Sequence, residues 1–94
     1  MTYNETSNGE PSILLPSVHM NGTSRQELLS LNFAALRAID AALTALRAAA
    51  PNARDFYVQG DYAFTVARAE HRCRVAALEQ VREEQEKIVA HLAP

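Results

Sequence analysis

The amino-acid sequence predicts an all-α fold in which two long antiparallel helices follow an extended N-terminal tail. Residues 25–50 and 61–92 contain no glycine or proline, and in the first segment apolar side chains recur every three or four residues. The ten residues between the segments begin with Pro51 and end with Gly60, which are typical helix breakers. Because 94 residues make a small core, we expect the hairpin to assemble into an oligomeric helical bundle.

Residues 1–23 are predicted to be a flexible tail that precedes a helical hairpin at 24–94. The first 12 residues are rich in Asn, Thr, Ser, Gly and Glu, a composition that is typical of disorder. Residues 13–15 are apolar and lie between two prolines, which favours an extended arm. This arm would pack either on its own hairpin or on a neighbouring subunit.

The first helix is predicted to begin with a capping box. Ser24 and Glu27 have the spacing at which a hydroxyl and a glutamate satisfy each other's free backbone amides. The face opposite the contact seam is predicted to be exposed to solvent, and Phe33 is its one apolar residue, so we expect the tail or another subunit to cover it. The other residues of this face are Gln26, Ser30, Arg37, Asp40, Thr44 and Arg47. The predicted contact seam consists of Leu29, Asn32, Leu36, Ile39, Leu43, Leu46 and Ala50.

The second helix is predicted to begin with Asp61 as its N-cap. Projection at 100° per residue gives an apolar stripe, with the polar residues Glu70, His71, Arg74 and Gln85 in or beside it. A two-helix hairpin could not hide these polar groups completely, so we expect them in a network between subunits. The stripe consists of Ala63, Ala67, Leu78, Val81, Ile88 and Leu92.

Charge and composition exclude several classes of protein. The net charge is −2, and basic and acidic residues share the second helix, so direct DNA binding is not expected. Cys73 is the only cysteine, which excludes an internal disulfide and fits a reducing cytoplasm. No unbroken apolar run approaches the ~20 residues that cross a bilayer, and the N-terminus lacks signal-peptide features. We therefore expect a location in the host-cell cytoplasm, with no membrane partner.

The first candidate site is the segment Asn21-Gly22-Thr23-Ser24 before the first helix, flanked by His19 and Arg25. The start of a helix presents free amides and a partial positive charge, which attract phosphate or carboxylate. The segment is therefore either a plain cap and turn or a cap that also binds an anion.

The second candidate site is Arg54-Asp55-Phe56-Tyr57 in the connection. An arginine beside aromatic rings can hold a nucleotide, because the guanidinium binds phosphate and the rings stack on a base. Alternatively, the rings fold over the open end of the hairpin and the charged side chains stay solvated.

These two sites would lie at opposite ends of one hairpin, because a helix of 26 residues is about 39 Å long. They could meet only between antiparallel neighbours, which points to pockets between the subunits of a homo-oligomer.

His71 has no nucleophile at a recognisable spacing, and no metal motif is visible, so we expect neither catalysis nor a cofactor.

Two segments of the sequence carry a family resemblance. Val18-His-Met-Asn-Gly-Thr-Ser24 and Pro51-Asn-Ala-Arg-Asp-Phe-Tyr57 resemble the VH(L/M)NGTS and PN(G/A)RD(F/Y)Y segments of a family of small phage and prophage helical-hairpin proteins. The resemblance covers about residues 16–92 and implies the fold but no activity. Ala53 replaces an expected glycine, which bears on how tightly the loop turns.

A looser analogy concerns phage counter-defence proteins, several of which are small helical oligomers that sequester nucleotide signals between subunits. On this basis we expect a non-enzymatic sponge for a small phosphorylated signalling nucleotide. The alternative is a structural or protein-interaction module that uses its apolar helix faces. Such a module would serve as a virion or packaging accessory or as an inhibitor of a host protein.

Overall fold

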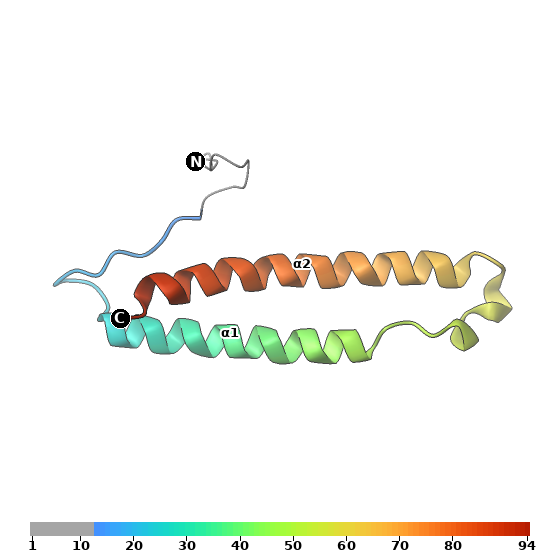
Figure 1. The fold of residues 1–94 in the computed structure, drawn as a ribbon, viewed down its shortest axis with the longest axis horizontal. Helices are drawn as coiled ribbons and strands as arrows, with labels where there is room; N and C mark the ends of the chain where they lie inside the picture. Colours follow the sequence, from blue (N-terminus) through green and yellow to red (C-terminus); the bar gives the residue numbers. More distant parts are fainter. Residues whose placement is uncertain (1–12) are drawn as a thin grey trace.

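The computed structural model describes residues 13–94 and shows two long helices side by side (Figure 1). Helix α1 spans Arg25–Ala48 and helix α2 spans Ala63–Leu92, and they run antiparallel. The predicted disorder of residues 1–12 lies outside the described residues. Within the described part the fold is all-helical and extended, 61 Å along its longest axis, as the sequence predicted for the hairpin.

Helix α1 begins as predicted and ends two residues earlier than predicted. The Oγ of Ser24 accepts a hydrogen bond of 3.1 Å from the backbone N–H of Glu27, which is the serine half of the capping box. At the other end Ala49 caps the helix, and its N–H donates to the carbonyls of Ala45 and Leu46. Pro51 disfavours helix at the residue before it, so Ala50 leaves the helix.

The connection contains two short 3₁₀ turns, η1 (Ala53–Asp55) and η2 (Tyr57–Gln59). Gly60 follows with φ of +122°, a conformation that side chains disfavour and glycine adopts easily.

The predicted N-cap of α2 is wrong. The helix begins at Ala63, and Tyr62 occupies the cap position without a side-chain hydrogen bond. The chain enters the helix through a turn in which the N–H of Ala63 donates to the carbonyl of Gly60, so Asp61 comes too early to cap it.

The contact between α1 and α2 buries few apolar side chains. Among the described residues the buried hydrophobic ones are Leu36, Leu43 and Leu92. Leu36 and Leu43 belong to the predicted seam of α1, so that part of the prediction is confirmed. The seam is otherwise lined by half-buried side chains, which include Leu29, Asn32, Ile39 and Leu46 of α1 and Val75, Leu78, Gln85 and Val89 of α2.

The predicted stripe of α2 is only partly correct. Val81 was placed in it, but its side chain is 48% exposed. Two helices in contact keep a repeat of about 3.5 residues per turn, and a projection at 3.6 residues drifts away from the true seam over eight turns. His71 therefore lies on the seam and is only 7% exposed, so a single hairpin does hide this polar residue.

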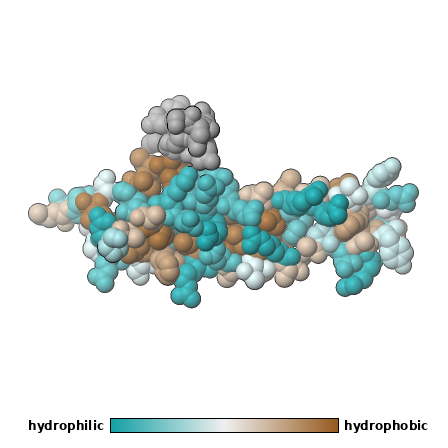
Figure 2. Space-filling model, in the orientation of Figure 1, coloured by the Kyte–Doolittle hydropathy of each residue, from teal (hydrophilic) through white to brown (hydrophobic). Residues whose placement is uncertain are grey.

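The tail from Ile13 to Met20 contains no helix or strand and lies beside the end of α2 that carries the C-terminus (Figure 1). A hydrogen bond of 2.9 Å joins Nε2 of His91 to the carbonyl oxygen of Pro16. Leu14 stays 80% exposed, so this arm leaves an apolar side chain in solvent. Figure 2 shows further hydrophobic side chains, in brown, that reach the surface between hydrophilic ones.

By length and composition alone, α1 could cross a membrane. The sequence predicts no membrane partner, because charged residues interrupt every apolar run before it could span a bilayer. The mean hydropathy of α1 nevertheless stays as high as that of a membrane-spanning helix. Arg37 and Asp40 lie near its middle, where charged side chains are costly in a bilayer. The alanine and leucine that make α1 apolar are also the residues of a soluble packing helix, so this feature is weak evidence for a membrane location.

Candidate functional site

The segment before α1 forms a compact turn and cap. The N–H of Gly22 donates to the carbonyl oxygen of His19 at 3.1 Å, and the imidazole folds back over the glycine. A Cβ at position 22 would lie only 2.8 Å from Nε2 of His19, so the ring could not keep this place beside a larger residue. Asn21, Thr23 and Ser24 are exposed around this turn.

Two of the predicted anion-binding groups at this end already have partners. The Oγ of Ser24 accepts from the amide of Glu27, and Nη1 of Arg25 donates to the carbonyl oxygen of Leu92 at 3.0 Å. Arg25 thus caps the C-terminus of α2, where the helix dipole favours a positive charge. The turn still presents the hydroxyl of Thr23, and the first amides of a helix have no partner within it.

At the other end of the hairpin the connection folds around a pocket of about 500 Å³. Phe56 lines it and is half-buried, whereas Arg54 and Tyr57 are exposed. Oδ1 of Asn52 accepts from the backbone N–H of Arg54 at 3.0 Å, which fixes the first 3₁₀ turn. The pocket is lined by Ala49, Ala50, Pro51, Asn52, Asp55, Phe56, Ala67, Glu70 and Arg74.

This pocket brings together residues that the sequence assigned to different roles. Phe56 was a predicted ligand residue, whereas Glu70 and Arg74 were predicted interface residues. The i,i+4 spacing favours an ion pair between Glu70 and Arg74. The ion pairs of the described residues do not include it, so the Arg74 guanidinium can take another anion. Asp55 and Glu70 oppose that role, because the pocket holds two carboxylates against one guanidinium.

The remaining predicted interface residues, His71 and Phe33, lie apart from this pocket. His71 is buried within the single chain. Phe33 is 48% exposed and lines an apolar groove near the opposite end of the hairpin. Neither residue adds a polar group to the pocket beside Phe56.

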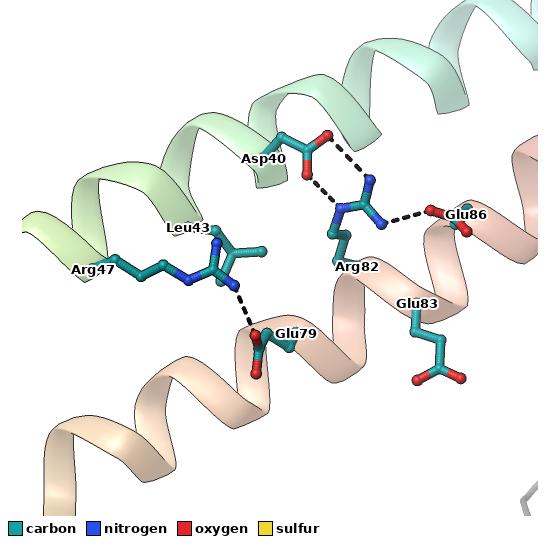
Figure 3. Close-up of a pocket in the computed structure, with 7 residues that line it drawn as sticks. All are labelled: Asp40, Leu43, Arg47, Glu79, Arg82, Glu83 and Glu86. Atoms are coloured by element: carbon teal, nitrogen blue, oxygen red, sulfur yellow. Dashed lines mark hydrogen bonds and ion pairs between the residues drawn. The ribbon is translucent and has the colours of Figure 1, made fainter.

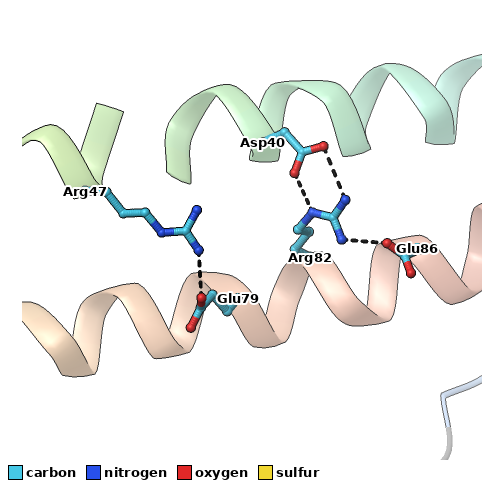
Figure 4. Close-up of polar contacts among 5 residues, drawn as sticks. All are labelled: Asp40, Arg47, Glu79, Arg82 and Glu86. Atoms are coloured by element: carbon cyan, nitrogen blue, oxygen red, sulfur yellow. Dashed lines mark hydrogen bonds and ion pairs between the residues drawn. The ribbon is translucent and has the colours of Figure 1, made fainter. Parts of the chain in front are cut away.

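A ladder of ion pairs between the two helices was missed by the sequence analysis. Nε and Nη2 of Arg82 donate to the two carboxylate oxygens of Asp40, and Nη1 donates to Glu86 (Figure 4). One heptad further along α1, Arg47 pairs with Glu79 at 2.7 Å. The signal was the i,i+7 spacing of Asp40 and Arg47, which had been assigned to the solvent face.

These ion pairs border a depression of about 350 Å³ (Figure 3). The hydrogen bond from Arg82, together with the positive charges of Arg82 and Arg47, lowers the pKa of Asp40 and outweighs the opposing effect of desolvation. The hydrogen bonds to Asp40 and Glu86 raise the pKa of Arg82. Because the charged groups bind one another, the depression is better explained as a helix–helix contact than as a ligand site.

Within residues 13–94 no group of three His, Cys, Asp or Glu side chains is placed to hold a metal ion. Comparison with known proteins finds no matching family, curated protein or solved structure. The resemblance to small phage and prophage hairpin proteins therefore stays a prediction.

Proposed function

We propose that the chain is a non-catalytic phage counter-defence protein of the host-cell cytoplasm. It binds a small phosphorylated signalling nucleotide in pockets between the subunits of a homo-oligomer and so sequesters it. The observation that supports this proposal best is the pocket at the loop end. There Phe56 and Arg74 line the same pocket, and the guanidinium of Arg74 makes no ion pair in the described residues.

The chemistry of this pocket suits one part of a nucleotide. An aromatic ring offers a stacking surface for a base, and an arginine offers a fork of donors for phosphate. Tyr57 is 74% exposed and Arg54 is also exposed, and both are neighbours in the chain of the pocket residues Asp55 and Phe56. Sequestering a diffusible nucleotide requires tight binding but no catalysed reaction.

The pocket of one chain is incomplete for a phosphorylated ligand. Asp55 and Glu70 repel phosphate, and Arg74 alone does not compensate for two carboxylates. The amides and hydroxyl near Thr23 could add donors, but they lie at the far end of a molecule 61 Å long. A second, antiparallel chain would bring that turn to the pocket, which is why the proposal includes an oligomer.

Isothermal titration calorimetry of the purified protein against cyclic dinucleotides, cyclic trinucleotides and ADP-ribose derivatives tests the proposal. We expect saturable binding of at least one phosphorylated nucleotide, and native mass spectrometry should report the subunit number and any retained ligand. A folded oligomer that binds none of these compounds would contradict the proposed sequestration of a nucleotide.

The second candidate function is a structural or protein-interaction module, either a virion or packaging accessory or an inhibitor of a host protein. It is favoured by the apolar groove around Phe33 and by the exposed Leu14 of the arm. A stoichiometric protein partner that co-purifies from host lysate, without a bound nucleotide, would support this function over the first.

A further inference from the structure

An apolar groove of about 460 Å³ lies where the start of α1 meets the end of α2. Among the described residues no charged side chain lines it, and Phe33, which is 48% exposed, forms part of its wall. The arm from Ile13 to Met20 does not line the groove, so this part of the chain's own tail leaves it open. The lining residues are Gln26, Leu29, Ser30, Phe33, Val89 and Ala93.

The opposite end of the same hairpin exposes apolar and aromatic side chains. Tyr57 and Val58 in η2 are 74% and 77% exposed, and Tyr62 is 79% exposed. Val66, one helical turn further along, is 53% exposed. A cluster of this kind within ten residues is costly to leave in water, and Tyr is enriched where proteins bind each other.

The two ends also carry opposite charge. The loop end, residues 48–78, has four basic residues against three acidic ones: Arg54, Arg68, Arg72 and Arg74 against Asp55, Asp61 and Glu70. The groove end, residues 13–33 and 80–94, has the reverse: Arg25, Arg82 and Lys87 against Glu27, Glu83, Glu84 and Glu86. Arg47 and Glu79 pair with each other between these two ends and cancel. This small difference in charge favours two copies in antiparallel orientation over two parallel copies.

We propose that the Phe33 groove receives Tyr57 and Val58 of a second copy of this chain that lies antiparallel to the first. In a two-fold pair both grooves are filled by the same contact, so the association closes on itself. This inference deepens the oligomer of the proposed function. The loop end of one copy, with Arg54 and Phe56, then lies beside the turn around Thr23 of the other.

Disulfide trapping between two single-cysteine variants tests this contact. Ser30 lines the groove and Val58 lies in the loop end, and both are exposed. In a Cys73→Ser background, Ser30→Cys chains are mixed with Val58→Cys chains and oxidised with dilute copper phenanthroline. We expect a mixed disulfide dimer on non-reducing gels, because the two cysteines are held at a high effective concentration.

Thr44→Cys is the matched control, because Thr44 is exposed on α1 two heptads beyond Ser30 and thus on the same helix face. The mixture of Ser30→Cys and Val58→Cys should trap about tenfold more dimer than the mixture of Thr44→Cys and Val58→Cys. Equal trapping in the two mixtures would overturn the proposal. A monomer by light scattering at the trapping concentration would overturn it as well.

Phe33→Arg provides a second readout that does not depend on cysteine chemistry. We expect it to reduce the apparent mass in size-exclusion light scattering, with the helical circular dichroism retained. A higher disulfide yield between Leu14→Cys and Ser30→Cys than between Val58→Cys and Ser30→Cys would show that the arm fills the groove. That result would contradict the proposed contact with the loop end.

Failure here and failure of the nucleotide proposal are distinguishable. A trapped dimer that binds no nucleotide would contradict the proposed ligand and support the proposed contact between copies. An oligomer that binds a nucleotide but forms no mixed disulfide would contradict the contact and support the ligand.

Discussion

Arg82 of α2 lies opposite Asp40 of α1 and donates from two guanidinium nitrogens to its two carboxylate oxygens (Figure 4). The pair joins two helices that share only a thin apolar seam. Both side chains are partly exposed, so solvent screens their attraction and the pair adds little stability by itself. Together with Arg47 and Glu79 it fixes which turn of α1 faces which turn of α2.

The stability of the hairpin should therefore depend on pH through Asp40. Because the folded protein lowers the pKa of this carboxyl, the contribution of Asp40 is fully present above its unfolded pKa of about 3.9. It is lost as the pH falls through the lower folded value. We expect Asp40→Asn to lower the Tm by a few degrees at pH 7, and this difference should shrink as the pH falls through the lowered pKa of Asp40. Thermal unfolding of both proteins between pH 2 and 7 measures this, and a difference independent of pH would contradict it.

A second polar contact on the seam should show the cost of an unpaired group. Nε2 of Gln85 donates to Oδ1 of Asn32 at 2.8 Å and to the backbone carbonyl oxygen of Asn32 at 3.0 Å. Gln85→Leu should destabilise the chain by about 1 kcal/mol, because it leaves a half-buried acceptor unpaired. The double variant Asn32→Leu with Gln85→Leu should recover that loss, since no polar group is then stranded. Urea unfolding of the four proteins in a double-mutant cycle gives the coupling energy, and strictly additive effects would argue against the contact.

The double variant should also lose specificity. A polar residue at a seam position selects one alignment of two helices, and an all-leucine seam accepts several. We expect its native mass spectrum to contain more oligomeric species than that of the unmodified protein.

Few apolar side chains are buried, so each should matter. Leu43 is only 2% exposed, and Leu43→Ala should cost about 2–4 kcal/mol, enough to unfold much of so small a hairpin at 37 °C. Leu31 has the same chemistry on the same helix but is 62% exposed. Leu31→Ala should change the Tm by no more than a degree or two in the monomer. Circular dichroism melts of both variants decide this, and equal losses would mean that Leu31 is buried in an assembly.

The fold could be predicted from the sequence because its signals are local. Ser24 and Glu27 mark the start of α1, and Pro51 and Gly60 bracket the connection, so the helices are confirmed to within two residues. The error at Asp61 comes from the backbone turn between Gly60 and Ala63, which sets where the chain first becomes helical. Local residue preference does not contain that information.

The contacts between the helices were harder to predict. Asp40 and Arg47 were assigned to the solvent face because charge alone does not reveal a partner on another helix. The pocket likewise combines Phe56 with Arg74, which belong to different segments and were assigned different roles. Their proximity depends on the relative alignment of the two helices, and helix periodicity fixes that only to within a turn.

The turn before α1 should tolerate alanine in place of Gly22, but the His19 ring should then move from its position over residue 22. In Gly22→Ala the new Cβ would collide with the His19 imidazole, whose ring can swing away at small cost. We expect a Tm within about two degrees of the unmodified protein, because no backbone strain is involved. The His19 ring resonances should shift in a two-dimensional NMR spectrum. Unchanged ring shifts would show that the imidazole does not lie over Gly22 in solution.

Charge substitutions in the loop-end pocket should change nucleotide affinity in opposite directions. Arg74 supplies the pocket's only guanidinium, so Arg74→Ala should weaken binding of a phosphorylated ligand by about tenfold or more. Glu70→Gln removes a carboxylate from the same pocket and keeps the size of the side chain, so it should strengthen binding several-fold by relieving repulsion. Both residues are exposed, and neither should change the Tm by more than a degree or two. Calorimetric titration with the best nucleotide of the panel measures the two affinities. If both variants bind as tightly as the unmodified protein, the ligand does not place its phosphate in this pocket.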